Sequence, residues 1–279
     1  MPTLRPMLAA DVDQATDMIL SHDWGVRREF LAFATSQPAC TPMVAAANGT
    51  IVGTGVGTAN ETVGWIGTIF LAPAWRGQGL GRAITQAIID RLEAMGARTL
   101  VLVATADGRR LYETMGFEVQ TRYRIFEAPG LAGPGASAES RSVRGFRAED
   151  LEAILAIDRD GTGEDRGHVI RRLATPETAR VALGIDGTIE GFVIRAPWGG
   201  GATVARSVEA SLDIVAARRV SAGPDGRVRV GLLQENASGM AQLEAIGFAP
   251  SWSAPRMIRG EPLTWHPESI WGQFNHAIG

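Results

Sequence analysis

Short apolar runs separated by turn residues fill the chain before residue 72, and a helical pattern follows them. The apolar segments between residues 43 and 71 are interrupted at Asn48-Gly49 and at Asn60-Glu61, and Asn-Gly between apolar runs is a strong β-hairpin signal. Residues 65–71 (WIGTIFL) have strand length and are rich in β-branched and aromatic side chains. Residues 82–96 then space their apolar side chains along one face of an α-helix. The pattern predicts an antiparallel meander that leads into a long helix.

The same pattern predicts elements on both sides of this region. We expect a strand at 4–7, helices at 12–22 and 27–37 with Asp11 as the first N-cap, a strand at 98–104, a helix at 107–115 and a strand at 118–128. The succession of strands and helices is that of an α/β (α+β) domain. Residues 130–142 are small, polar and turn-rich, which predicts a linker.

The remainder of the chain repeats the first half weakly. The corresponding pairs are Arg5 with Arg144 and Asp11 with Asp150 (shift 139, from 144 − 5 and 150 − 11), and Gly116 with Gly247 (shift 131, from 247 − 116). Self-similarity of this kind indicates a duplicated unit. We therefore expect one domain over residues 1–129, a linker over 130–142 and a second domain over 143–279.

The turn between the meander and the long helix is rich in glycine and cations, reading Arg76-Gly77-Gln78-Gly79-Leu80-Gly81-Arg82. Unpaired N–H groups of a first helical turn, together with the helix dipole, favour an anion, and glycine lets the backbone approach a phosphate closely. A P-loop would end in Gly-Lys-Ser/Thr, but Arg82-Ala83 follow Gly81 here. The dinucleotide fingerprint also fails, because Arg82 stands where its third glycine belongs.

Two motifs in this region resemble those of the GNAT acetyltransferase superfamily. The first is R-x-x-G-x-G at residues 76–81, like the family's coenzyme A pyrophosphate loop. The second is Leu111-Tyr112-Glu113-Thr114-Met115-Gly116-Phe117, like the family's LYxxxGF. The resemblance implies tandem GNAT folds, each a mixed, mostly antiparallel twisted sheet flanked by helices, with acetyl-CoA (coenzyme A) as co-substrate. An intact first copy and a divergent second copy are similar to two-domain bacterial GNAT proteins.

The resemblance also implies roles for individual residues. The loop backbone would hold the pyrophosphate, and the preceding strand would hold the pantetheine and the thioester carbonyl. Tyr112 would be the catalytic acid for the departing thiolate, since a phenol with a pKa near 10 is protonated at neutral pH; its ring could instead simply fill a helix–sheet contact. The expected cofactor-binding residues are Ile69, Phe70, Leu71, Arg76, Gly77, Gln78, Gly79, Leu80, Gly81 and Arg82.

The residues that would bind and activate the acceptor are less clearly indicated by the sequence. The substrate candidates His22, Asp23 and Trp24 lie between the first two helices, a region that lines acceptor pockets in the family, although an ordinary helix junction explains them equally well. No carboxylate lies on the strand WIGTIFL, so Thr68 or a water would have to act as general base. Further candidates are Asp23, Glu29 and Glu61 at turns. The acidic run 158–165 is expected to be an exposed loop that attracts a cationic acceptor if it faces the cleft.

The second copy differs where the chemistry is expected. After the strand GFVIRAP come Trp198-Gly199-Gly200-Gly201-Ala202-Thr203, with no R-x-x-G-x-G, and Leu243 takes the place of Tyr112 (112 + 131). Asn236 is expected to start a helix rather than to act as a catalyst. We therefore expect the second domain to shape the acceptor pocket and not to bind coenzyme A productively.

Composition narrows the class of protein. A net charge of −3 and a pI of about 5.9 give no basic footprint for nucleic acid or for an acidic membrane. Cys40 is the one cysteine, so no internal disulfide can form, which suits a reducing compartment. No signal-like apolar core and no run near 18 apolar residues is present, so we expect a cytoplasmic protein without a membrane span. The four histidines lack ligand spacing, so no metal site is expected.

These features favour an acetyl-CoA-dependent N-acetyltransferase that acts on a small-molecule amine by direct attack. A second hypothesis keeps the reaction and makes the acceptor a protein lysine or N-terminus. A third is a non-catalytic protein that binds acyl-CoA and regulates a partner. A groove open at both ends would favour the protein acceptor, and a pocket covered by the second domain would favour the small molecule.

Overall fold

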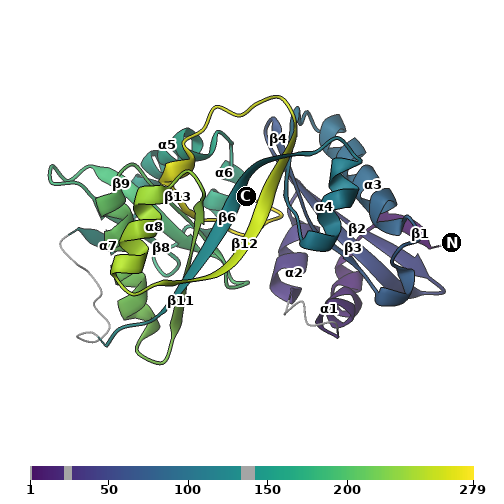
Figure 1. Cartoon of the computed structure of the whole chain (residues 1–279), viewed down its shortest axis with the longest axis horizontal. Helices are drawn as coiled ribbons and strands as arrows, with labels where there is room; N and C mark the ends of the chain where they lie inside the picture. Colours follow the sequence, from purple (N-terminus) through teal and green to yellow (C-terminus); the bar gives the residue numbers. More distant parts are fainter. Residues whose placement is uncertain (1, 22–26, 133–141) are drawn as a thin grey trace.

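A computed structural model describes residues 2–21, 27–132 and 142–279, and its two halves have the same succession of elements (Figure 1). The first half contains β1 (Thr3–Pro6), α1 (Val12–Leu20), α2 (Arg28–Ser36), β2 (Cys40–Ala47), β3 (Thr50–Asn60), β4 (Val63–Leu71), α3 (Leu80–Ala94), β5 (Thr99–Val103), α4 (Ala106–Glu113) and β6 (Glu118–Pro129). The second half contains β7 (Val143–Gly145), α5 (Leu151–Thr162), α6 (Gly167–Leu173), β8 (Ala179–Leu183), β9 (Ile189–Arg195), β10 (Gly201–Ala205), α7 (Val208–Ala222), β11 (Arg227–Leu233), α8 (Ala237–Ala245) and β12 (Ala249–Gly260), followed by β13 (Ile270–Gly272). The predicted order of elements is confirmed, and so are the tandem α/β folds. The eight-stranded sheet is mixed through its parallel pair β4–β5, and the described pairs of the five-stranded sheet are antiparallel.

Glycines in the meander allow the long helix to approach the sheet. A Cβ at Gly55 would lie 2.6 Å from a methyl carbon of Ile84, and a Cβ at Gly57 would lie 2.5 Å from one of Ile88. Both isoleucines lie on the buried face of α3. The alternation of glycine along β3 therefore makes room for α3 to pack directly on the strand backbone.

The internal repeat corresponds to a repeated ion pair at the start of each half. Arg5 binds both carboxylate oxygens of Asp11 at 2.6 and 2.8 Å, and Arg144 binds Asp150 in the same way at 2.7 and 2.8 Å. Each carboxylate also accepts a backbone N–H at 2.7 Å, that of Leu8 or of Arg147. Asp11 is the N-cap residue of α1, as predicted, but its side chain forms no capping hydrogen bond with that helix. It fixes the strand that precedes the helix instead.

The last strands of the two halves are exchanged, which the sequence pattern did not reveal. In the described residues, one sheet has the order β1-β2-β3-β4-β5-β12-β6-β11, and a second sheet has the order β13-β10-β9-β8-β7. β12 comes from the end of the second half but pairs with β5 of the first, and β6 comes from the first half but pairs with β11 of the second. Figure 1 shows β6 and β12 side by side where the halves meet. Each half thus completes the sheet of the other.

The hydrophobic core is also shared between the halves. One cluster of buried side chains contains Phe30 and Phe70 from the first half and Phe192 and Phe274 from the second. A second cluster lies between α3 and the first half's sheet. No helix in the described ranges is long and apolar enough to cross a membrane.

Candidate functional site

The fourth strand separates from its parallel neighbour halfway along its length. β4 and β5 are paired from Val63–Thr99 to Ile66–Leu102, and the register goes no further. β4 continues to Leu71, held by β3 alone on the other side. Beyond Ile66, β4 has no strand partner on its β5 side among the described residues, and backbone groups at such an edge can pair with a ligand.

A bulge at Thr68 lies at the point of separation. Thr68 has a φ of 53°. On the neighbouring strand β3, the pairing register with β4 shifts between Thr54 and Val56. The hydroxyl of Thr54 donates to the Thr68 carbonyl at 3.0 Å, which holds the strained residue in place. Beyond the bulge, Ile69 and Leu71 contact the α3 side of the sheet and Phe70 packs in the cluster on the opposite side.

The glycine-rich turn follows directly, between a 3-10 turn (Pro73–Trp75) and α3. Gly77 and Gly79 have φ values of 74° and 79°, and no atom lies within 4 Å of where their Cβ atoms would be. The side chains of Arg76 and Gln78 fold back on the turn, donating to the Leu71 carbonyl at 3.2 Å and to the Ala74 carbonyl at 2.8 Å. Those two side chains shape the loop and leave its backbone exposed.

The loop backbone has the properties of an anion site. The N–H groups of residues 77–82 donate to no acceptor among the residues that the structure describes. They lie at the N-terminus of α3, which begins at Leu80 with Gly79 as an N-cap that offers no side chain. Buried Leu80 anchors the first turn, and Arg82 donates to the hydroxyl of Thr114 on the segment after α4. Unpaired donors, a helix dipole and two open glycines fit an anion such as a diphosphate.

Tyr112 lies in α4 on the α3 side of the same sheet. Thr105 starts α4 by accepting the N–H of Gly108 at 3.1 Å. Gly108 makes room for the phenol ring, since a Cβ there would lie 3.0 Å from Tyr112 Cε2. Burial raises the pKa of Tyr112 to about 12, so the hydroxyl keeps its proton throughout the neutral range.

The other acceptor-side candidates are not brought together in the described residues. His22, Asp23 and Trp24 lie outside the described residues. Glu29 and Glu61 are exposed, and Glu61 lies in the turn between β3 and β4. Thr68 is half-buried, with its carbonyl already bonded to Thr54. Among the described residues, no group of three or more histidine, cysteine, aspartate or glutamate side chains could hold a metal ion.

The prediction of an acidic loop at 158–165 is wrong in two respects: α5 continues to Thr162, and Asp158 and Glu164 are buried. Glu164 is 4% exposed and accepts the Asn60 amide and the Trp65 indole N–H, both at 2.7 Å. Its other oxygen lies 3.9 Å from the guanidinium of Arg256, which stacks on the Trp265 ring at 4.2 Å. Asp158 is buried in an ion pair with Arg166. Burial raises the pKa of Glu164, and the two arginines oppose that shift.

The segment after β13 packs on β4, and the motifs did not point to it. The space that a Cβ of Gly67 would occupy is taken by the backbone of the C-terminal segment, with the His276 carbonyl oxygen 2.3 Å away. The His276 ring lies between the rings of Tyr123 and Trp252, with centroid separations of 5.2 and 5.7 Å. The glycine in WIGTIFL was the available signal, because a strand glycine often marks a close backbone approach.

Acidification is expected to destabilise the protein through His276. Burial lowers the pKa of His276 to about 4, whereas an unfolded histidine has a pKa of about 6.5. Because the folded value is the lower one, stability that is present above pH 6.5 is lost as the pH falls toward 4. Between pH 7 and pH 4.5, urea denaturation should show a loss about 2 kcal/mol larger in the wild type than in His276→Asn. Equal losses would contradict the low pKa.

The second copy has a different arrangement at the corresponding place. β10 pairs with β13, while β10 and β11 have no register in common among the described strands. Trp198–Thr203, which lack the R-x-x-G-x-G motif, lie at the turn that joins β9 to β10 and not before a helix. β10 leads to α7 through Arg206 and Ser207 alone, and the Ser207 hydroxyl accepts the Ala210 N–H. No glycine loop precedes α7, so the anion site of the first half has no counterpart here.

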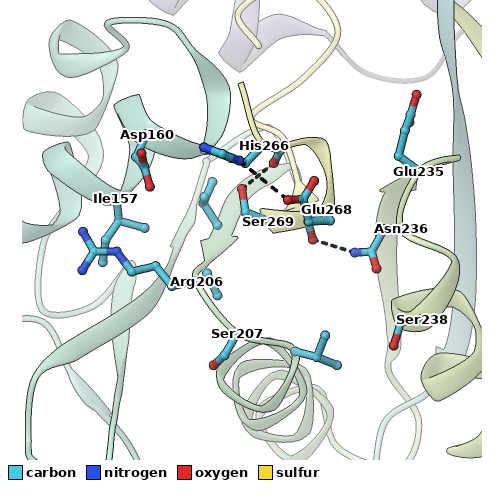
Figure 2. A pocket seen from close by; sticks show the side chains of 14 residues that line it. Ile157, Asp160, Arg206, Ser207, Glu235, Asn236, Ser238, His266, Glu268 and Ser269 are labelled. Carbon is cyan, nitrogen blue, oxygen red and sulfur yellow. Dashed lines mark hydrogen bonds and ion pairs between the residues drawn. The ribbon is translucent and has the colours of Figure 1, made fainter. Parts of the chain in front are cut away.

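A cavity of about 440 Å³ lies at this end of the second copy. Figure 2 shows Asp160 and Arg206 on one side of it and Asn236 and Ser238 on the other, with the Asn236 amide donating to the Glu268 carbonyl at 2.7 Å. Asn236 also starts α8 by accepting the Gly239 N–H at 2.8 Å, as expected of a helix-start residue. The cavity thus lies where α7 and α8 begin.

Comparisons with known proteins agree with this architecture. The model "Acetyltransferase (GNAT) family" matches residues 9–117, and the model "Acetyltransferase (GNAT) domain" matches residues 154–272. No curated protein matches the chain. A putative acetyltransferase from Pyrococcus horikoshii is similar in structure, with a TM-score of 0.82 at 18% identity over 100% of this chain and 96% of that one.

Two further solved structures have the same two-part fold. A GCN5-related N-acetyltransferase from Sphaerobacter thermophilus matches with a TM-score of 0.63 at 16% identity, over 95% of this chain and 97% of that one. A tandem GNAT protein from the clavulanic acid biosynthesis pathway matches with a TM-score of 0.61 at 15% identity, over 95% and 100%. The chain therefore belongs to the GNAT acetyltransferase family and carries two copies of its fold.

Proposed function

We propose that the protein transfers an acetyl group from acetyl-CoA to the amine of a small molecule, using the N-terminal copy. The observation that carries this proposal is the loop at residues 76–82, whose exposed N–H groups follow a strand that has separated from its neighbour. The loop would hold the pyrophosphate, and the free edge of β4 from Thr68 to Leu71 would hold the pantetheine amides. The second copy lacks both features.

The reaction requires the protein to position the two substrates and to donate one proton. The thioester supplies an activated acyl group, so a neutral amine can attack its carbonyl carbon directly. A nitrogen–carbon bond forms, the carbon–sulfur bond breaks, and the amine releases a proton to solvent. A backbone N–H at the free edge of β4 would stabilise the negative charge on the carbonyl oxygen. The Tyr112 hydroxyl would donate its proton to the departing sulfur.

Tyr112→Phe is expected to lower kcat about 10²-fold and to leave the KM for acetyl-CoA within twofold. The phenylalanine ring keeps the contact with Phe117, which the tyrosine makes edge-on at 6.1 Å, and removes the proton donor. Steady-state kinetics with a thiol reagent would measure both constants. An unchanged kcat in Tyr112→Phe would remove the assigned acid.

A small acceptor is favoured by what covers the sheet face opposite α3. The C-terminal segment packs on Gly67, and the Trp198 indole donates to the Phe274 carbonyl at 2.8 Å. Phe30 and Phe33 of α2 pack edge-on against the same Trp198 ring. Coverage by the second half restricts the space in which a protein segment could lie across the strand.

Release of coenzyme A across a panel of amines and peptides tests the acceptor class. Turnover on small amines alone supports the proposal, and turnover on lysine peptides or peptide N-termini alone would replace it with a protein acetyltransferase. Binding of acetyl-CoA without turnover on any acceptor would favour an acyl-CoA-binding regulatory protein.

A further inference from the structure

The ring of His276 lies level with the expected acyl carbon. Ile66, Leu102 and Met257 are aligned across β4, β5 and β12. Three residues further along the same direction, β4 reaches Ile69 (66 + 3), and β12, which runs antiparallel to it, reaches Ala254 (257 − 3). The partner of Ala254 on β6 is Tyr123. Two more residues along β12 lead to Trp252. Tyr123 and Trp252, the two rings on either side of His276, therefore lie at the height of Ile69–Leu71.

His276 also lies on the face that an acceptor would use. Its carbonyl occupies the side-chain position of Gly67, two residues from Trp65, whose ring points away from α3 toward Glu164. Tyr112 packs in the cluster on the α3 side. The assigned acid and His276 are therefore on opposite faces of the separated strands, so the amine and the proton for the departing sulfur would reach the thioester from different sides.

One nitrogen of His276 has no hydrogen-bond partner among the residues that the structure describes. Nδ1 is buried and makes no hydrogen bond in the described structure, although a buried polar atom normally has one. The nearby charge of Arg27 and burial both keep the pKa of the ring low, so the imidazole is neutral at pH 7 and can accept a hydrogen bond. The Trp252 ring stacked on it is 45% exposed, so a planar group could lie against it.

We propose that His276, contributed by the second half, positions the acceptor of the N-terminal copy by accepting a hydrogen bond from its amine. The proposal rests on the proposed acetyl transfer and adds a substrate class to it. The acceptor is an amine borne on an aromatic body, because the exposed ring of Trp252 presents a planar surface beside His276. 2-Phenylethylamine is the probe, with spermidine and glucosamine as comparison amines.

Two substitutions separate the hydrogen bond from the ring. His276→Phe keeps the stack between Tyr123 and Trp252 and removes the acceptor nitrogen, while His276→Asn places an oxygen close to the position of Nδ1. We expect His276→Phe to raise the KM for 2-phenylethylamine about tenfold, and His276→Asn to stay within threefold of the wild type. The KM for acetyl-CoA should change less than twofold in both. His266→Phe, in the cavity of the second copy, is the matched control.

A binding measurement keeps the proposal independent of turnover. NMR would follow the imidazole ¹⁵N signals of the wild-type protein, with coenzyme A present, during titration with each amine. The signals of His276 are identified as those that disappear in His276→Asn. We expect 2-phenylethylamine to move them at lower concentration than spermidine or glucosamine does. Signals that no amine moves, or a wild-type acceptor KM in His276→Phe, would overturn the assignment. Signals that move without coenzyme A release would contradict acetyl transfer and leave the His276 contact standing.

Discussion

Gly79→Asp is expected to raise the KM for acetyl-CoA about 10³-fold. Gly79 is the N-cap of α3 and has a φ of 79°, in a loop whose N–H groups face outward. An aspartate there would put a negative charge about 4 Å from the expected diphosphate, which costs about 4 kcal/mol at an effective dielectric constant of about 20. Initial rates at varied acetyl-CoA, and direct binding of coenzyme A by calorimetry, would measure the change.

Gly96→Asp is the matched control for this substitution. Gly96 also has a positive φ, 99°, and no atom lies within 4 Å of where its Cβ would be. It follows the other end of the same helix, so it imposes similar backbone strain away from the anion site. We expect its KM for acetyl-CoA to match that of the wild type. If the two variants had equal KM values, the loop would not be the phosphate site.

The parts of this site that could be predicted are those that depend on residues close together in the sequence. A strand, a glycine-rich turn and an amphipathic helix are local patterns, and the positive φ values of Gly77 and Gly79 are what glycine in such a turn supplies. Tyr112 was proposed in the same way, from a motif at residues 111–117 that begins in one short helix. The bulge at Thr68 was not visible, since a threonine with a φ of 53° is held by its partner Thr54 across the sheet.

The strand exchange and the buried charges could not be read from local sequence. β6 and β12 have the same length and the same position in their own halves. The sequence of a strand does not by itself specify which other strand it will pair with. Glu164 lies among glycines and acids, a composition typical of exposed loops. Its partners are remote, since Asn60 is 104 and Trp65 is 99 residues away. Arg256 lies beside Glu164 only in the folded protein.

Glu164→Ala is expected to lower the free energy of unfolding by about 3–5 kcal/mol, the cost of removing one partner from a buried ion pair. The substitution leaves the Trp65 indole N–H and the Asn60 amide without their common acceptor and Arg256 without its nearest carboxylate. Urea denaturation at pH 7, followed by circular dichroism and by tryptophan fluorescence, would measure it. Asp160→Ala is the control, because Asp160 is exposed in the same acidic run, and we expect it to change stability by less than about 0.5 kcal/mol.

The same experiment tests whether the two halves unfold as one unit. Glu164 belongs to the second half, and the two donors that bind it belong to the first. β12 and β6 connect the same two halves through their exchanged pairing. Because neither half has a complete sheet without the other, we expect both signals to report a single coincident transition that moves to lower urea in Glu164→Ala. Two separate transitions, with only one displaced by the substitution, would mean that each half is stable alone and that the exchange contributes little to folding.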